Sequence, residues 1–335
     1  PGHRDVSPLK RSDGARDEKS NVKRVTYYDI HSEIIMSQTL ISLDEYLESI
    51  ADKHGEPLDA ASLPDDSVRV HPGVEYGSIN GRSLLADIFT PSEQSAASAP
   101  VMVFVHGGGW ANGTRQQFHR HSAYLAWRHG ITSVCVSYRL SGEAVFPAAL
   151  LDVKCAVRWI RSQADEFDID PSRIGVGGDS AGAHLAAMMA ATTGCEDYEG
   201  SGGSDGFSSD VQLAVCYNPA IDLRQLIARE GVANECVSEF IGARLDQQPE
   251  RYTEASPICR IHEGMPPVLL LHGTGDTTIT HQQSVDFHEA LQQAGVVSEI
   301  VLYEDKPHSW FNQPQDFKEA LQRMEAFLVS HFGLT

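Results

Sequence analysis

The sequence lacks a long apolar run and has few basic residues. Among its 335 residues, no hydrophobic stretch approaches the roughly 18 residues that a membrane-spanning helix requires. The 46 Asp and Glu residues outnumber the 26 Lys and Arg residues, and the resulting net charge of −20 repels nucleic-acid phosphates. These two absences argue against a membrane span and against a nucleic-acid partner, and they leave the oligomeric state open.

Cysteine is also sparse. The six cysteines are widely spaced, and none forms a C-x-x-C pair or a Cys/His spacing typical of zinc ligands. We therefore expect mostly buried free thiols and no metal site. The chain begins with Pro1 and has no apolar signal-peptide core, which leaves the compartment open between the cytoplasm and secretion after removal of a leader.

Three regions differ in pattern along the chain. Residues 1–24 are polar and without periodicity, which predicts a flexible tail. Residues 25–69 form a predicted N-terminal helical segment, because apolar residues recur at helical spacing from about Thr39 to His54. Residues 70–335 carry the long alternating pattern of a single large domain.

Within that domain, strand and helix patterns alternate. GVEYGSIN and SLLADIFTP predict a hairpin, and apolar runs such as PVMVFV, ITSVCV and PVLLLH are typical of buried parallel strands. This order predicts an α/β fold with a doubly wound, mostly parallel sheet. The polar segment Asp222–His262 interrupts the alternation, and we interpret it as a small inserted cap.

A single serine, Ser180, lies on a predicted strand-to-helix turn in GVGGDSAGAHLAAMMA. Small residues at Gly178 and Gly182 allow the backbone to reverse there, as in a nucleophile elbow. Serine is also a frequent helix N-cap, so the pentapeptide alone leaves both interpretations open.

A glycine-rich loop, HGGGW at 106–110, directly follows a predicted buried strand. Three glycines free the backbone to turn its N–H groups toward one point, as an oxyanion-binding loop requires. The N–H of Ala181, the residue after the serine, would supply a further donor. Glycines also mark ordinary tight turns, so the loop is only suggestive by itself.

A general base must come from among fifteen histidines. His308 follows the last predicted strand, where it could reach the carboxyl edge of the sheet, and it fits the chain order Ser, acid, His. His272 and His106 are more simply read as structural residues beside strand ends, and His119 and His121 fall on a predicted helix.

The acid that orients the base is predicted to be Asp276, just beyond the buried strand in LLLHGTGD. Its competitor Asp305 lies only three residues before His308 and would more naturally bond to its own turn. Asp179, beside the serine, is interpreted as a structural residue that bonds nearby backbone amides.

Taken together, these elements resemble the serine esterases of the α/β-hydrolase superfamily. HGGGW and GDSAG look like the hormone-sensitive-lipase-like branch, and the segment 146–186 is also similar to acetyl-xylan and feruloyl esterases. The resemblance covers residues 70–332 and leaves the N-terminal segment and the cap without a match. The resemblance implies that Ser180 is the nucleophile, His308 the general base and Asp276 the acid that orients it. It also implies that the oxyanion donors are Gly108, Gly109 and Ala181. Ala183, where many relatives have glycine, and the PHSW context of His308 depart from the pattern.

The sequence therefore predicts a serine carboxylesterase without metal or organic cofactor, acting on a small-molecule ester through an acyl-enzyme. An amidohydrolase such as an arylformamidase or a peptidase, a feruloyl or acetyl-xylan esterase, and a non-catalytic hydrolase-fold binding protein remain alternatives. We expect short acyl groups to be preferred, because charged residues fill the predicted cap and because Trp110 and Trp310 could narrow the acyl pocket.

Overall fold

A mostly parallel sheet of nine strands runs through the part of the chain that this computed structural model describes, residues 41–42, 67–92, 98–230 and 234–334. All of these residues belong to one compact unit, Thr39–Thr335. In spatial order the strands are β1 (Ile41–Ser42), β2 (Val68–Ile79), β3 (Arg82–Pro91), β5 (Thr132–Val136), β4 (Ala99–Val105), β6 (Ile169–Asp179), β7 (Leu213–Tyr217), β8 (Val268–Gly273) and β9 (Ser298–Tyr303). Pairing is antiparallel among β1, β2, β3 and β5 and parallel from β5 through β9. The predicted mostly parallel sheet is confirmed.

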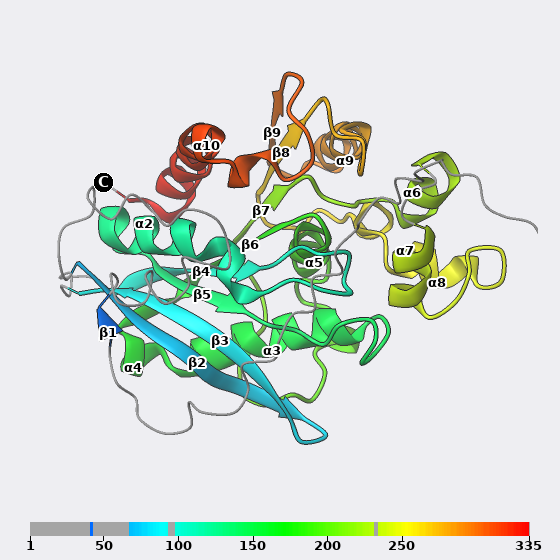
Figure 1. Ribbon diagram of the computed structural model, residues 1–335. Coiled ribbons are helices and arrows are strands. Elements are labelled where there is room, and N and C mark those ends of the chain that lie inside the picture. Colours follow the sequence, from blue (N-terminus) through cyan, green and yellow to red (C-terminus); the bar gives the residue numbers. More distant parts are fainter. Residues whose placement is uncertain (1–40, 43–66, 93–97, 231–233, 335) are drawn as a thin grey trace, which may run out of the picture. The chain divides into compact units, whose positions relative to one another are not determined.

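Helices cover both faces of the sheet (Figure 1). One face carries α3 (Ala148–Ser162), α5 (Ala181–Ala191) and α9 (Gln282–Gln293), and the other carries α2 (His119–His129) and α10 (Pro314–Phe332). Successive side chains of a strand point to opposite faces. Accordingly, Val101, Val103 and Val105 of β4 pack in the core with α3 and α5, whereas Met102 and Phe104 pack with α2 and α10. This is the doubly wound arrangement that the sequence predicts.

The N-terminal part of the sheet both confirms and corrects the sequence analysis. Strands β2 and β3 form the predicted antiparallel hairpin. Ile41–Ser42, inside the predicted helix Thr39–His54, instead form β1 and pair with β2, because strand pairing overrides the helical spacing there. The predicted tail, 1–24, and the remainder of the predicted helix lie outside the described residues.

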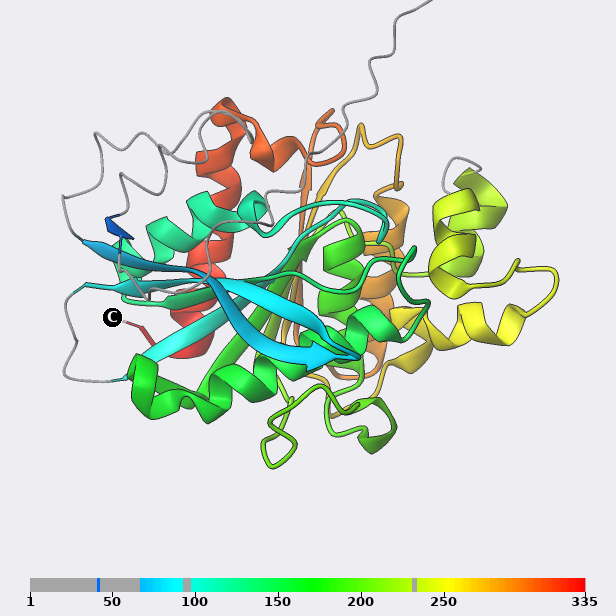
Figure 2. The same cartoon turned by 60° about the horizontal axis from the view of Figure 1, so that its bottom comes forward.

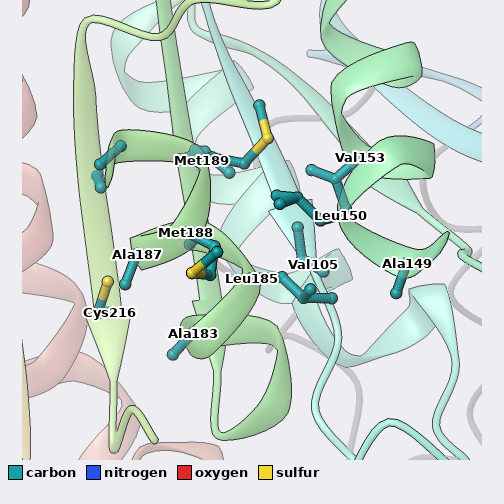
Figure 3. Close-up of a cluster of buried hydrophobic side chains, with 14 of the residues drawn as sticks. Val105, Ala149, Leu150, Val153, Ala183, Leu185, Ala187, Met188, Met189 and Cys216 are labelled. Atoms are coloured by element: carbon teal, nitrogen blue, oxygen red, sulfur yellow. The ribbon is translucent and has the colours of Figure 1, made fainter. Parts of the chain in front are cut away.

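Helix α5 is buried around its whole circumference. Figure 3 shows Met189 beside Leu150 of α3, and Ala187 beside Cys216 of β7. All eleven residues of the helix are buried. A helix that is apolar on all sides belongs in a core. Its fixed position determines where the turn between β6 and α5 lies, and that turn holds Ser180.

A helical insertion separates β7 from β8 and lies to one side of the sheet (Figures 1 and 2). It consists of α6 (Leu223–Glu230), α7 (Asn234–Ile241), α8 (Pro249–Glu254) and the 3-10 helix η4 (Pro257–Arg260). Leu226, Phe240 and Tyr252 belong to the same hydrophobic core as α5. The insertion corresponds to the predicted cap, Asp222–His262, and its capping role stays a prediction. No helix among the described residues has both the length and the apolar character that crossing a bilayer requires.

Candidate active site

Ser180 lies on a sharply reversed backbone between β6 and α5. Its φ is +54°, a conformation that non-glycine residues rarely adopt. A Cβ at Gly178 would lie 2.4 Å from the backbone of Gly182, and a Cβ at Gly182 would lie 2.1 Å from the carbonyl oxygen of Val105. Only glycine fits at these two positions. The predicted elbow is therefore present, and its glycines permit the close approach of strand and helix.

The hydroxyl of Ser180 does not cap the helix. Ser180 occupies the N-cap position of α5 but makes no side-chain cap hydrogen bond. Its Oγ lies 3.0 Å from Nε2 of His308, which follows β9. The alternative interpretation of Ser180 as an ordinary N-cap is therefore not supported.

His308 in turn bonds to Asp276, which follows β8. The distance from Nδ1 of His308 to Oδ2 of Asp276 is 2.6 Å. Because an ionised carboxylate only accepts, Nδ1 carries the proton, and Nε2 is left to accept the hydroxyl proton of Ser180. The competing acid Asp305 is exposed, and its backbone N–H bonds to Oγ1 of Thr274. The structure thus brings the three predicted residues into one hydrogen-bonded chain.

The environment of Asp276 keeps its carboxylate ionised. Oδ1 accepts the backbone N–H groups of Thr278 at 2.8 Å and Ile279 at 2.9 Å. Burial alone would raise the pKa of Asp276. Hydrogen bonds from His272, His308 and the backbone outweigh burial and hold that pKa well below its usual range.

His308 is shifted in the opposite sense. Burial alone would lower its pKa, but the hydrogen bond to Asp276 and the negative charges of Asp179 and Asp276 raise the pKa of His308 above 6.5. The side chain of His308 is 19% exposed, so solvent still reaches it. A histidine with a raised pKa beside a hydroxyl can take up a proton and hold it.

The HGGGW loop turns its backbone beside Ser180. Gly108 and Gly109 have φ values of +113° and +60°. The N–H of Gly107 is engaged at 2.6 Å by Oε1 of Gln117, in the 3-10 helix η2 (Arg115–Phe118). The N–H groups of Gly108 and Gly109 donate to no other described residue. Ala181, the first residue of α5, likewise has no intrahelical acceptor for its N–H. These three N–H groups are the ones that the sequence analysis singled out.

Asp179 is structural in a different way from the one predicted. Its carboxylate accepts side-chain donors rather than backbone amides: Nε2 of Gln117 at 2.8 Å, Oγ of Ser309 at 2.8 Å and Nδ2 of Asn218 at 3.2 Å. Burial raises the pKa of Asp179. Because Gln117 also holds Gly107, Asp179 connects the glycine loop to the loop that carries His308.

A pocket of about 320 Å³ opens at Ser180 and His308. Its walls include Gly108, Gly109, Trp110, Ala181, Leu226, Cys236, Thr278 and Ile279. Trp110 is a pocket residue as predicted, and its ring stacks on Phe240 with centroids 4.5 Å apart. In the described part of the chain, no three His, Cys, Asp or Glu side chains are grouped so that they could hold a metal ion.

Trp310 does not line this pocket. It packs against Tyr303, with ring centroids 4.0 Å apart, in the core on the side of α10. Ser309 has a positive φ of +54°, which turns the chain between His308 and Trp310. The prediction of Trp310 as a pocket residue is therefore wrong, because nearness in sequence did not fix the direction of its side chain.

Two polar residues at the site were missed by the sequence analysis. Gln117 gives no local signal, since its partners come from distant segments. His184 does give one, because it is the only polar side chain in an otherwise apolar helix, one turn after Ser180. Its Nδ1 accepts Nε1–H of Trp110 at 3.2 Å, and its Nε2–H donates to the carbonyl of Ala255 at 2.7 Å. His184 thus ties the glycine loop to α5 and to the insertion.

Comparison with known sequences places the chain among esterases. The BD-FAE family model matches residues 86–291. Esterase LipQ of Mycobacterium tuberculosis is 32% identical over 239 residues, which cover 70% of this chain and 55% of LipQ. The chain spans about half the length of the curated relatives that it matches.

Solved structures with similar folds are also esterases. A truncated carbohydrate esterase from gut microbiota superposes with a TM-score of 0.66 and 25% identity, over 80% of this chain and 99% of that one. Est2 of Thermogutta terrifontis with propionate bound gives a TM-score of 0.66 and 29% identity, over 77% and 93%. The same Est2 has been solved with butyrate bound and phosphonylated by sarin.

Proposed function

The chain belongs to the BD-FAE family, and from this membership and its site geometry we propose that it is a serine carboxylesterase acting on short acyl esters. One observation carries the proposal. An unbroken chain of hydrogen bonds runs from Ser180 through His308 to Asp276, and Ser180 and His308 line a pocket together with Gly108 and Gly109. Relatives named as esterases support the reaction class.

Acylation starts at Ser180. His308 Nε2 takes the hydroxyl proton as Oγ attacks the ester carbonyl, and a tetrahedral intermediate with a negatively charged oxygen forms. Asp276 holds the resulting imidazolium in orientation. The imidazolium then protonates the leaving alcohol as the carbon–oxygen bond breaks, which leaves the acyl group on Ser180.

Deacylation repeats these steps with water. His308 takes a proton from water as the hydroxide attacks the acyl-enzyme, and returns it to Oγ of Ser180 as the carboxylic acid leaves. The N–H groups of Gly108, Gly109 and Ala181 would stabilise the oxyanion in both intermediates. Preorganised donors of this kind contribute about 3 kcal/mol each to barrier lowering in acyl transfer.

The size of the pocket supports short acyl groups. A volume of about 320 Å³ is near the lower end of small-molecule pockets, and Trp110 stacked on Phe240 forms a rigid wall. Charged residues of the predicted cap do not limit the acyl group, because Glu235, Glu239 and Arg244 are exposed and line no part of the pocket. Bound propionate and butyrate in the similar Est2 favour the same size range.

Acetylated carbohydrates are the second candidate substrate class. The likeness to a carbohydrate esterase favours them, and so does the exposed hydroxyl-bearing Thr278 in the pocket wall. Such substrates would use the same triad and differ only in the alcohol that leaves.

The test is a panel of p-nitrophenyl esters from two to twelve acyl carbons, measured beside acetylated xylose. We expect kcat/KM to peak at or below four carbons and to fall by about 10⁴-fold or more in Ser180→Ala. Diethyl p-nitrophenyl phosphate should label Ser180 alone, as mass spectrometry of the digested protein would show. A folded Ser180→Ala enzyme with wild-type turnover would exclude the triad, and a peak at eight carbons or more would exclude the short-acyl assignment.

A further inference from the structure

Asp276 accepts hydrogen bonds from two histidines, although the triad uses only one. Its Oδ2 lies 2.6 Å from Nδ1 of His308 and 3.2 Å from Nε2 of His272. His272 lies near the end of β8, and its side chain is completely buried. The position of His272 beside a strand end predicts a structural residue, and no step of acylation or deacylation uses it.

The partners of His272 determine where its proton lies. Nε2 faces Oδ2 of Asp276 and, at 2.9 Å, the carbonyl oxygen of Ile279. An ionised carboxylate and a carbonyl only accept, so Nε2 must carry the proton. Nδ1 lies 2.7 Å from Oγ of Ser284 on α9, and with the proton on Nε2 it accepts the hydroxyl proton. A directed chain therefore runs from Ser284 through His272 to Asp276.

This second donor acts on the oxygen that His308 uses. The other oxygen, Oδ1, is already held by the N–H groups of Thr278 and Ile279. Without His272, Oδ2 would bond to His308 alone and present its full negative charge to the imidazole. Because the site is buried, losing this hydrogen bond should change the pKa of His308 more than it would at an exposed site.

We propose that His272 is a positioning residue of the triad, whose Nε2–H fixes Oδ2 of Asp276 and moderates the basicity that this oxygen confers on His308. The proposal rests on the proposed function for its kinetic readout. His272 is not among the residues that line the pocket, so it acts through Asp276 and not on the substrate.

The charged groups around the pair are few, which makes the effect measurable. His308 faces Asp276 and Asp179, and Asp276 faces His272 and His308. Lys306, on the loop before His308, is paired with Asp316 at 2.6 Å. Removal of the His272 donor therefore changes one interaction of Asp276 and leaves the surrounding charges in place.

The main variant is His272→Leu. We expect the acid limb of kcat/KM on p-nitrophenyl acetate to move upward by about half to one pH unit, because a less-shared carboxylate binds the protonated imidazole more tightly. We expect kcat to fall about tenfold and KM to stay within about twofold of wild type. His272→Gln keeps an N–H donor and should recover most of both effects.

Ser284→Ala provides a milder variant with the ring retained. It removes the hydroxyl that bonds to Nδ1, so Nε2–H becomes a weaker donor and the acid limb should move upward by a smaller amount. This variant keeps the proposal testable if the buried leucine prevents folding.

The matched control is His288→Leu. His288 lies on α9 with Ser284, and its Nδ1 is also 2.7 Å from a serine hydroxyl, that of Ser298. It has no contact with Asp276. Its removal should leave the acid limb unchanged.

Proton NMR separates this inference from the proposed function. The low-field resonance of Nδ1–H in His308 titrates with the imidazole, whichever ester the protein hydrolyses. An upward shift of that titration in His272→Leu supports the inference even in a protein that hydrolyses none of the esters tested. A folded His272→Leu variant whose His308 titrates at or below the wild-type pH would overturn it.

Discussion

His308 lies within reach of two buried carboxylates, and only one of them is its hydrogen-bond partner. Asp276 bonds to Nδ1, while Asp179 acts on the imidazole through its charge and holds the neighbouring Ser309 at 2.8 Å. Burial would lower the pKa of His308, but these carboxylates raise it. Asp179, which directly precedes the nucleophile in the sequence, thus also raises the pKa of the base.

This arrangement predicts the pH dependence of activity. Only the neutral imidazole can take the proton of Ser180, and the pKa of His308 is raised. As pH decreases, kcat/KM on a neutral ester should therefore fall along an acid limb centred above pH 6.5. Asp179→Asn removes one negative charge that raises the pKa of His308, so it should move that limb downward by about 0.5 pH unit. The control is Asp305→Asn. Asp305 is an exposed aspartate on the loop that carries His308, and its replacement should leave the limb in place. A wild-type limb at or below pH 6 would contradict the raised pKa.

At the scale of elements, two helices of the insertion complete the pocket. Leu226 of α6 and Cys236 of α7 line it, and Cys236 lies beside the glycine loop, because a Cβ at Gly109 would lie 3.6 Å from Sγ of Cys236. These helices are far in sequence from HGGGW, so no local pattern indicates that they meet. The insertion therefore contributes directly to the acyl site in the proposed function.

Enlarging the residue at Cys236 should shorten the acyl chain that is accepted. Cys236→Phe fills space beside Gly109, so kcat/KM on the p-nitrophenyl butyrate should fall about tenfold relative to the acetate, since overpacking a fixed wall costs about 1–3 kcal/mol. Cys259→Phe places the same ring on an exposed cysteine of the insertion and should not change the ratio. An unaltered butyrate-to-acetate ratio in folded Cys236→Phe would exclude α7 from the acyl wall.

The elements differ in how much the sequence could show. Buried strands such as β4 and β7 were predictable because full burial produces continuous apolar runs. The carboxyl ends of the parallel strands β6, β8 and β9 then placed Ser180, Asp276 and His308 at one edge of the sheet. The short strand β1 was not, since two residues carry no periodicity. The direction of Trp310 depended on the positive φ of Ser309, which no composition pattern reveals.

Across the whole molecule, buried histidines are kept neutral on several elements. Burial lowers the pKa of His106 to about 4, of His121 to about 3 and of His184 to about 4. His106 bonds to the carbonyl of Gly107, and His184 bonds to Trp110 and the insertion. His121 differs, because neither of its ring nitrogens has a hydrogen-bond partner among the described residues. It lies among aromatic rings that include Phe317, with centroids 4.7 Å apart.

These three histidines predict that the free energy of unfolding falls steeply in acid. In the unfolded chain each titrates near 6.5, whereas in the folded protein each stays neutral down to pH 3–4, so the unfolded state binds more protons in between. Stability should therefore decrease as pH falls below 6.5, with a slope of up to about 4 kcal/mol per pH unit for three protons. Because the pKa of His308 is raised, its effect on the free energy of unfolding changes with pH only above about 6.5, and the slope below pH 6.5 is unaffected. His121→Phe loses no hydrogen bond and removes one of the three protons. Urea unfolding at pH 5, 6 and 7 should therefore give an average slope lower by about 1 kcal/mol per pH unit, and a variant more stable than wild type at pH 5. If the free energy of unfolding had the same pH dependence in variant and wild type, burial would not keep His121 neutral in the folded protein.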